Sequence, residues 1–268
     1  MSARGCPYSC NFCQNSDKKV DYFTASRTVD NVERLFEIGI KDVFFVDDIF
    51  TLNLQHMSDI YNECKRRGVK IENHNHFFTH ISSINKESIG MMHKFSPTRV
   101  EVGIESGDDE MLRLMGKNTT AALIYKNIRL LAKYVPVHGL FLIGYPGETS
   151  RSLLNTINFV KKIRGYLTGI WVSYYSPIPG TMGFHTALKN GRITSEEINN
   201  AEIAYIDNNL TVAMLQRYRD RIFKTASKRN LYFRAVHRLK YLLANMNRDR
   251  WWASVDILDN YSKKCPKI

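Results

Sequence analysis

Three cysteines near the N-terminus are the most specific chemical feature of the sequence. Cys6, Cys10 and Cys13 have the spacing Cys-x3-Cys-x2-Cys, in a loop-like stretch that also contains Gly5 and Pro7. Thiolates are soft ligands that suit iron–sulfur clusters, zinc or Cu(I). A structural zinc site needs four protein ligands, whereas a cubane cluster on three thiolates leaves one iron open for another ligand. The spacing therefore favours a [4Fe-4S] cluster over a zinc knuckle completed by a distant histidine, or over unrelated buried cysteines.

Helical and strand patterns alternate between residues 28 and 179, with a turn signal at almost every change. Strands are expected at Val43–Val46, Ile71–Ile81, Arg99–Ile104, Val137–Ile143 and Gly169–Tyr175. Helices are expected at Thr28–Ile38, up to Gly68, at Lys86–Lys94, around Met111, at Thr120–Tyr134 and at Ser150–Arg164. This alternation predicts an α/β fold with a parallel sheet covered by helices.

Polar or glycine-rich residues follow four of the expected strands. They are Asp47-Asp48, Glu105-Ser106, Gly144-Tyr145-Pro146-Gly147 and Tyr175-Ser176. In α/β sheets and barrels, ligands bind at the C-terminal ends of the strands. We therefore expect these four tips to line one mouth.

The segment Arg4–Cys13 resembles the cluster loop of the radical S-adenosylmethionine (SAM) superfamily, and most of all the branch whose members often carry an upstream cobalamin-binding domain. Further matches follow in the order of that family, at Val46–Phe50, Gly103–Gly107, Leu142–Thr149 and Ser176–Thr181. The resemblance covers residues 2–195. It implies a (β/α)6 TIM-like barrel of parallel strands.

The resemblance also implies the cofactors and the chemistry. A [4Fe-4S] cluster on Cys6, Cys10 and Cys13 would bind the amino and carboxylate groups of SAM at its open iron. An external electron donor reduces the cluster, which passes one electron to the sulfonium, and the resulting 5′-deoxyadenosyl radical takes a hydrogen atom from the substrate or methyl chemistry follows. In such enzymes the protein positions the cofactor and excludes water, so no catalytic side chain is assigned.

Five positions match SAM-contacting positions of the family. Phe12 resembles the aromatic residue beside the adenine, and Asp47 and Asp48 occupy the tip that meets the methionine amino group. Glu105 matches the position that contacts the ribose hydroxyls. Lys117 lies where relatives place a cation facing the methionine carboxylate. Carboxylates and ammonium groups suit these tasks because they form charge-assisted hydrogen bonds.

Two further groups of residues have less specific interpretations. Gly144 is expected to let the backbone approach the cofactor, although a tight turn would equally need glycine there. His74, His76 and His80 alternate on an expected strand and so should share one face. We interpret them as a polar sheet face or substrate contacts rather than as metal ligands.

The chain begins only five residues before Cys6, which predicts a departure from the family. The first barrel strand and an upstream cobalamin domain cannot lie in those residues. We expect a partial barrel of five strands with an exposed edge. Cobalamin could then take part only through a missing domain or partner, and a partner chain could supply the N-terminal part.

The net charge of +12 is unevenly distributed. Residues 1–210 contain 24 Lys/Arg against 22 Asp/Glu, whereas residues 211–268 contain 14 against 4. We therefore assign the basic character to the C-terminal part rather than to the core. The predicted domains are a radical SAM core at 1–195 and a helical basic extension at 196–268, with apolar residues at helical spacing. These are Leu215, Tyr218, Ile222, Val236, Leu239 and Leu243.

The composition is ordinary for a soluble protein, with 44% apolar and 24% charged residues. A transmembrane segment and a signal peptide are not expected, which favours a cytoplasmic protein. The favoured function is a radical SAM enzyme, a methyltransferase or an oxidoreductase, acting on an unidentified small or acidic substrate. A tRNA-modifying methylthiotransferase-like enzyme is the alternative, in which nucleic acid is the less favoured partner. The third is an inactive iron–sulfur-binding fragment.

Overall fold

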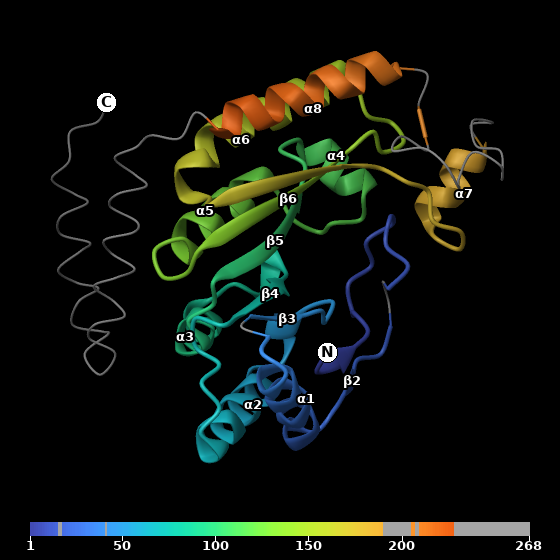
Figure 1. Cartoon of the computed structure of the whole chain (residues 1–268). Helices are drawn as coiled ribbons and strands as arrows, with labels where there is room; N and C mark the ends of the chain where they lie inside the picture. The colour runs from blue at the N-terminus through green and yellow to red at the C-terminus, as the bar shows by residue number, and fades with distance from the viewer. Residues whose placement is uncertain (16–17, 41, 190–204, 207–208, 228–268) are drawn as a thin grey trace, which may run out of the picture. The chain divides into compact units, whose positions relative to one another are not determined.

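Five parallel strands form the central sheet in a computed structural model, which describes residues 1–15, 18–40, 42–189, 205–206 and 209–227. The strands lie side by side in chain order, β3-β4-β5-β6-β7 (Figure 1). Their bounds are β3 Val43–Phe45, β4 Asn75–Thr79, β5 Arg99–Glu105, β6 Val137–Ile143 and β7 Gly169–Tyr174. At least one α-helix separates each strand from the next, which confirms the predicted parallel sheet. The second of these strands, β4, is shorter than expected at both ends.

Helices cover one face of the sheet, and their apolar residues form a core with the strand residues that point the same way. The bounds are α1 Ala25–Glu37, α2 Leu54–Arg67, α3 Lys86–Phe95, α4 Asp109–Leu114, α5 Ala121–Leu131, α6 Ser150–Ile163, α7 Met182–Lys189 and α8 Val212–Ser227. Short 3-10 turns lie at η1 Phe50–Leu52, η2 Ile81–Ser83 and η3 Arg164–Tyr166. The helices α6 and α8 lie next to each other (Figure 1).

Most helix ends agree with the sequence signals, with one correction. The helix α2 ends at Gly68, whose φ of 74° is the left-handed conformation that glycine favours at this position. By contrast, α1 begins after Thr24, whose side chain accepts a hydrogen bond from the Arg27 N–H. The predicted cap, Thr28, lies inside the helix and donates its hydroxyl to the Thr24 carbonyl. Both threonines suit a cap, and only the path of the chain distinguishes them.

The expected exposed edge of the sheet is β3, which pairs on one side with β4 and with no other strand among the described residues. The first residues of the chain form a separate two-stranded antiparallel ladder. In it, β1 (Ala3–Arg4) pairs with β2 (Asp21–Tyr22). This ladder was not predicted from the sequence. Because β1 and β2 pair with each other, the two ends of the segment that contains the cysteine loop lie next to each other.

The C-terminal part contributes to the core through α8. Leu215, Ile222 and Ala226 of this helix are buried in the same apolar cluster as the sheet. The chain as far as Lys228 forms one compact unit. The predicted domain boundary at residue 195, and the expected helix with Val236, Leu239 and Leu243, lie outside the described residues. No helix among those described is long and apolar enough to cross a membrane.

Candidate cofactor site

A cavity of about 320 Å³ lies where the cysteine loop meets the C-terminal ends of the strands. The loop, the residues that follow β3, and β4, β5 and β6 contribute to its wall, as expected for ligand sites of parallel sheets. The lining residues are Cys6, Tyr8, Cys10, Phe12, Cys13, Val46, Asp47, Asp48, Ile49, Phe78, Thr79, His80, Gly103, Glu105, Lys117 and Leu140. Five of the six predicted SAM contacts are in this set, and Gly144 is not.

The carboxylate of Asp48 fastens both ends of the cysteine loop to β3. The Gly5 N–H donates to its Oδ2 at 3.1 Å, and the Asn15 side-chain amide donates to its Oδ1 at 2.8 Å. A Cβ at Gly5, whose φ is 101°, would lie 2.2 Å from the Lys19 carbonyl oxygen, so only glycine fits. In this arrangement Asp48 sets the position of the thiols. Neither Asn15 nor this role was predicted from the sequence.

A second set of contacts fixes the middle of the loop through Asn11. Its backbone N–H donates to the Met115 carbonyl and its side-chain amide to the Leu114 carbonyl, each at 2.8 Å. Its own carbonyl accepts from the Gly183 N–H at the start of α7. The loop is therefore held from both sides of the cavity, by β3 and by α4 and α7. The motif Cys-x3-Cys-x2-Cys alone carries no signal for the partners of Asn11.

The thiols require deprotonation before they can bind metal. Burial raises the pKa of Cys10 to about 11, although nearby Lys117 opposes this effect. Burial also raises the pKa of Cys6. At neutral pH both would be thiols in the free protein, so cluster binding would release protons.

The arrangement of these cysteines bears on the kind of metal they suit. Within the described part of the chain, no three His, Cys, Asp or Glu side chains converge closely enough to hold a single metal ion. A cubane makes a different demand, because each thiolate binds its own iron. Three cysteines on one cavity wall, with no fourth among the described residues that line it, fit a [4Fe-4S] cluster with an open iron. This set of donors does not suit a structural zinc ion.

Asp47, the other predicted carboxylate at this tip, is committed to the N-terminus of the chain. Its two oxygens accept hydrogen bonds from the Ser2 N–H, the Ser2 hydroxyl and the Ala3 N–H, and its side chain is buried. These contacts give Asp47 a structural task, namely to attach β1 to the sheet. Its predicted contact with the methionine amino group remains a prediction.

Glu105 and Lys117 form an ion pair inside the cavity. The Lys117 Nζ lies 2.8 Å from the Glu105 Oε1, and only 3% of the lysine side chain is exposed. Glu105 sits at an irregularity between β5 and β6, with φ of 65°, a conformation uncommon for residues other than glycine. A Cβ at Gly103 would lie 2.5 Å from the Glu105 oxygen and 2.7 Å from the Lys117 nitrogen. Gly103 therefore makes room for the pair, a function that the sequence did not indicate.

Phe12 and Gly144 have different surroundings. Phe12 lines the cavity and packs against an apolar cluster that includes Tyr145 and Tyr175. Gly144 has a left-handed φ of 83°, and its N–H donates to Glu148. The tips after β6 and β7 thus pack behind the cysteine loop and do not line this cavity, contrary to the expectation of one mouth lined by all four. The turn explanation of Gly144 is the one that its geometry favours.

Only one of the three alternating histidines reaches the cavity. His80 lines it, with its ring stacked on Tyr8 of the cysteine loop. His76 stacks on Phe44 of the edge strand. His76, Phe78 and His80 alternate along one face of this run, as predicted for His76 and His80. His74 precedes β4 and lies edge-on to Phe36 of α1.

Fold and site together define the class of protein: the chain belongs to the radical SAM superfamily, whose family model matches residues 2–160. The predicted family and partial TIM-like barrel are thereby confirmed, and with them the cofactors of the family, a [4Fe-4S] cluster and SAM.

Among curated proteins, the chain is 30% identical over 198 residues to the "Uncharacterized methyltransferase PH0819" of Pyrococcus horikoshii, covering 71% of this chain and 42% of that protein. It is 25% identical over 191 residues to a tRNA-2-methylthio-N(6)-dimethylallyladenosine synthase of a Sulfurihydrogenibium species, covering 66% and 43%. The chain thus spans less than half the length of these two relatives.

Among solved structures, the cobalamin-dependent SAM radical enzyme OxsB with aqua-cobalamin bound has the same fold. The TM-score is 0.61 at 17% identity, over 77% of this chain and 38% of OxsB. At this identity the likeness concerns the fold alone.

Proposed function

We propose that this chain is the catalytic core of a radical SAM enzyme that reductively cleaves SAM to begin radical chemistry on a small or acidic substrate. The observation that carries the proposal is the cavity in which Cys6, Cys10 and Cys13 face Glu105 and Lys117 at the C-terminal ends of the strands.

The residues of the cavity wall and the cysteine loop would bind the cluster, position that loop and contact SAM. The three thiolates would hold the cluster, and Asp48 with Asn11 would keep the loop in the geometry that three-point attachment needs. The cluster, when bound, supplies one electron to the sulfonium of SAM. Glu105 would accept hydrogen bonds from the ribose hydroxyls, and Lys117 would neutralise the methionine carboxylate.

SAM binding would therefore exchange partners within the cavity. Lys117 and Glu105 now satisfy each other, and a buried charge is costly unless it is paired. The methionine carboxylate would replace Glu105 as the partner of Lys117, and the ribose hydroxyls would replace Lys117 as donors to Glu105. The apolar lining from Val46, Ile49, Phe78 and Leu140 would exclude water from the reacting bond.

The proposed reaction also requires an electron donor, and it could involve a partner protein. An external electron carrier must reduce the cluster, and a partner or further segment could extend the sheet at β3 or bring cobalamin. A cytoplasmic location is proposed because that compartment keeps thiols reduced, which the proposed cluster ligands Cys6, Cys10 and Cys13 require.

The test is formation of 5′-deoxyadenosine from SAM after anaerobic cluster reconstitution and reduction with dithionite. The native chain and Cys64→Ala should form the product, and Cys13→Ala should not. Cys64 is a matched control because it is a buried cysteine in α2, outside the cavity. A native chain that binds a four-iron cluster but forms no product would show that this length of chain is insufficient. Failure to bind any cluster would contradict the proposal.

Modification of tRNA is the second candidate function, and the distribution of charge favours it. Residues 117–189 contain nine Lys/Arg and one Asp/Glu, Glu148, which is buried. The basic character is thus not confined to the C-terminal part, contrary to the sequence interpretation. Exposed cations follow the outward sides of α5, α6 and α8. They are Lys126, Arg129, Arg151, Lys161, Lys162, Arg217, Arg221 and Lys224.

This second candidate is tested by binding of the whole chain to tRNA at two salt concentrations. Neutralisation of several phosphates should make the affinity fall by about 10-fold or more between 50 and 200 mM salt. Polyglutamate of similar charge is the control for a merely acidic partner. Equal binding of both polyanions would contradict recognition of RNA.

A further inference from the structure

His80 lies at the point where β4 turns into η2, and it lines the cavity in contact with the cysteine loop. We propose that His80 is a positioning residue whose Nε2–H donates a hydrogen bond to the carboxylate of bound SAM, next to Lys117. The inference rests on the proposed function. It goes beyond that function by assigning a neutral donor that the cluster loop itself holds in place.

The ring of His80 is fixed by the cysteine loop. It stacks on Tyr8 with ring centroids 3.6 Å apart and an interplanar angle of 16°. Tyr8 lies between Cys6 and Cys10 in sequence and also lines the cavity. Any ordering of the loop by a cluster would therefore also order the His80 ring.

The proton on this ring is assigned from its backbone contact. The Ser82 N–H donates to the His80 Nδ1 at 3.2 Å, so Nδ1 acts as an acceptor and Nε2 carries the hydrogen. Burial, together with the positive charge of Lys117, lowers the pKa of His80 to about 3. His80 is therefore a neutral donor at physiological pH.

The Nε2–H needs an acceptor. This atom is buried and has no hydrogen-bond partner among the residues that the structure describes. A buried donor without a partner costs free energy, which an acceptor in the cavity would recover. Lys117 is the charged group whose electrostatic effect contributes to lowering the pKa of His80, and its ammonium group donates a hydrogen bond to Glu105. A cation and a neutral N–H donor that line the same cavity suit an anion, and the carboxylate is the anion that SAM carries.

The test compares SAM with decarboxylated SAM in equilibrium dialysis against the cluster-loaded protein. The variant His80→Phe keeps a flat ring on Tyr8 but removes the donor. It should bind SAM about 10-fold more weakly and decarboxylated SAM unchanged, as expected for a lost hydrogen bond to a charged group. His80→Gln retains an N–H donor and should recover part of the loss. His76→Phe, in β4 and outside the cavity, should bind both ligands like the native protein.

Three results would overturn the assignment. Equal weakening of both ligands in His80→Phe would mean that the ring only shapes the cavity, and unchanged SAM binding would mean that it donates nothing to the ligand. A shift of the cluster midpoint potential in His80→Phe before SAM is added would instead place the donor on a cluster sulfur. If the native, cluster-loaded protein bound no SAM, the proposed function itself would be contradicted.

Discussion

At the scale of single residues, the charged side chains that line the cavity already have hydrogen-bond or ion-pair partners within the protein. Asp47, Asp48, Glu105 and Lys117 are all charged residues of the cavity wall. The first two attach the N-terminus and the cysteine loop to β3, and the last two pair with each other.

Substitution of Gly103 by alanine should weaken SAM binding by about 10-fold, because loss of a favourable charged contact has this order of cost. The new Cβ would collide with the ends of Glu105 and Lys117, which are flexible and would move apart while the backbone stays. Dialysis of the cluster-loaded protein with SAM measures the effect. Gly90→Ala, in α3, is the matched control because its Cβ meets nothing within 4 Å. Native affinity in Gly103→Ala would show that the ion pair does not shape the ligand site.

Glu148 should make folding stability decrease with rising pH. It is fully buried, its Oε1 has no partner within the described chain, and burial raises its pKa to about 8 from an ordinary value of 4.5. The folded state thus retains a proton that the unfolded state releases. The stabilisation is complete below about pH 4.5 and is lost as the pH rises to about 8. Denaturant unfolding between pH 5 and 8, roughly this window, should show a smaller loss in Glu148→Gln. Parallel stability curves for both proteins would refute the assignment.

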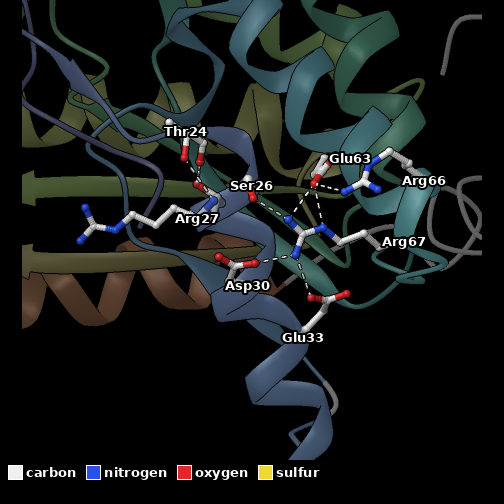
Figure 2. Close-up of polar contacts among 9 residues, drawn as sticks. Thr24, Ser26, Arg27, Asp30, Glu33, Glu63, Arg66 and Arg67 are labelled. Carbon is white, nitrogen blue, oxygen red and sulfur yellow. Dashed lines mark hydrogen bonds and ion pairs between the residues drawn. The ribbon is translucent and has the colours of Figure 1, made fainter.

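At the scale of elements, a network of ion pairs joins the first two helices (Figure 2). Arg67 at the end of α2 contacts Asp30 and Glu33 of α1, and Glu63 of its own helix. The side chain of Arg67 is only 18% exposed. Since α1 and α2 border β3 and β4, the network stabilises the part of the sheet that carries Asp48.

Replacement of Arg67 by lysine should lower the melting temperature more than the same change at Arg66. Arg67 uses its planar fork to reach both helices, and lysine cannot reproduce that geometry. Arg66 contacts only Glu63 and is largely exposed, which makes it the control. Hydrogen bonds from both arginines lower the pKa of Glu63 to about 2. This contribution is present above about pH 4.5 and is lost as the pH falls towards 2. Equal melting temperatures for the two variants would count against the network.

At the scale of the whole molecule, the C-terminal helix α8 belongs to the core. It packs beside α6 (Figure 1) and buries Leu215 and Ile222. Arg164 of η3 also donates to the Thr225 carbonyl at 3.3 Å. A fragment that ended before α8 would expose the apolar surface of α6.

Ile222→Ala should therefore reduce the free energy of unfolding by about 2–4 kcal/mol, the usual cost of truncating a buried large aliphatic side chain. Chemical denaturation of the whole chain measures it, with Arg221→Ala on the exposed side of the same helix as the control. A change below about 0.5 kcal/mol, typical of surface sites, would mean that α8 is dispensable.

The sequence by itself determined the cluster loop, the parallel sheet and the family. Cys6, Cys10 and Cys13 are specified by local spacing, and strands such as Val137–Ile143 by local apolar runs, so neighbours in the chain contain the information. The tips after β3 and β5 were likewise placed correctly, because parallel strands end at one edge.

Only the tertiary structure decided which partner each polar group takes. Asp48 meets Gly5 and Asn15, Asn11 meets Leu114, and His80 meets Tyr8, across separations that no local pattern encodes. These choices depend on burial, because a polar group removed from water must find whichever partner the packing brings within reach. Chain spacing therefore predicts where the proposed cofactor site lies, and packing determines which of its polar atoms already have partners within the protein.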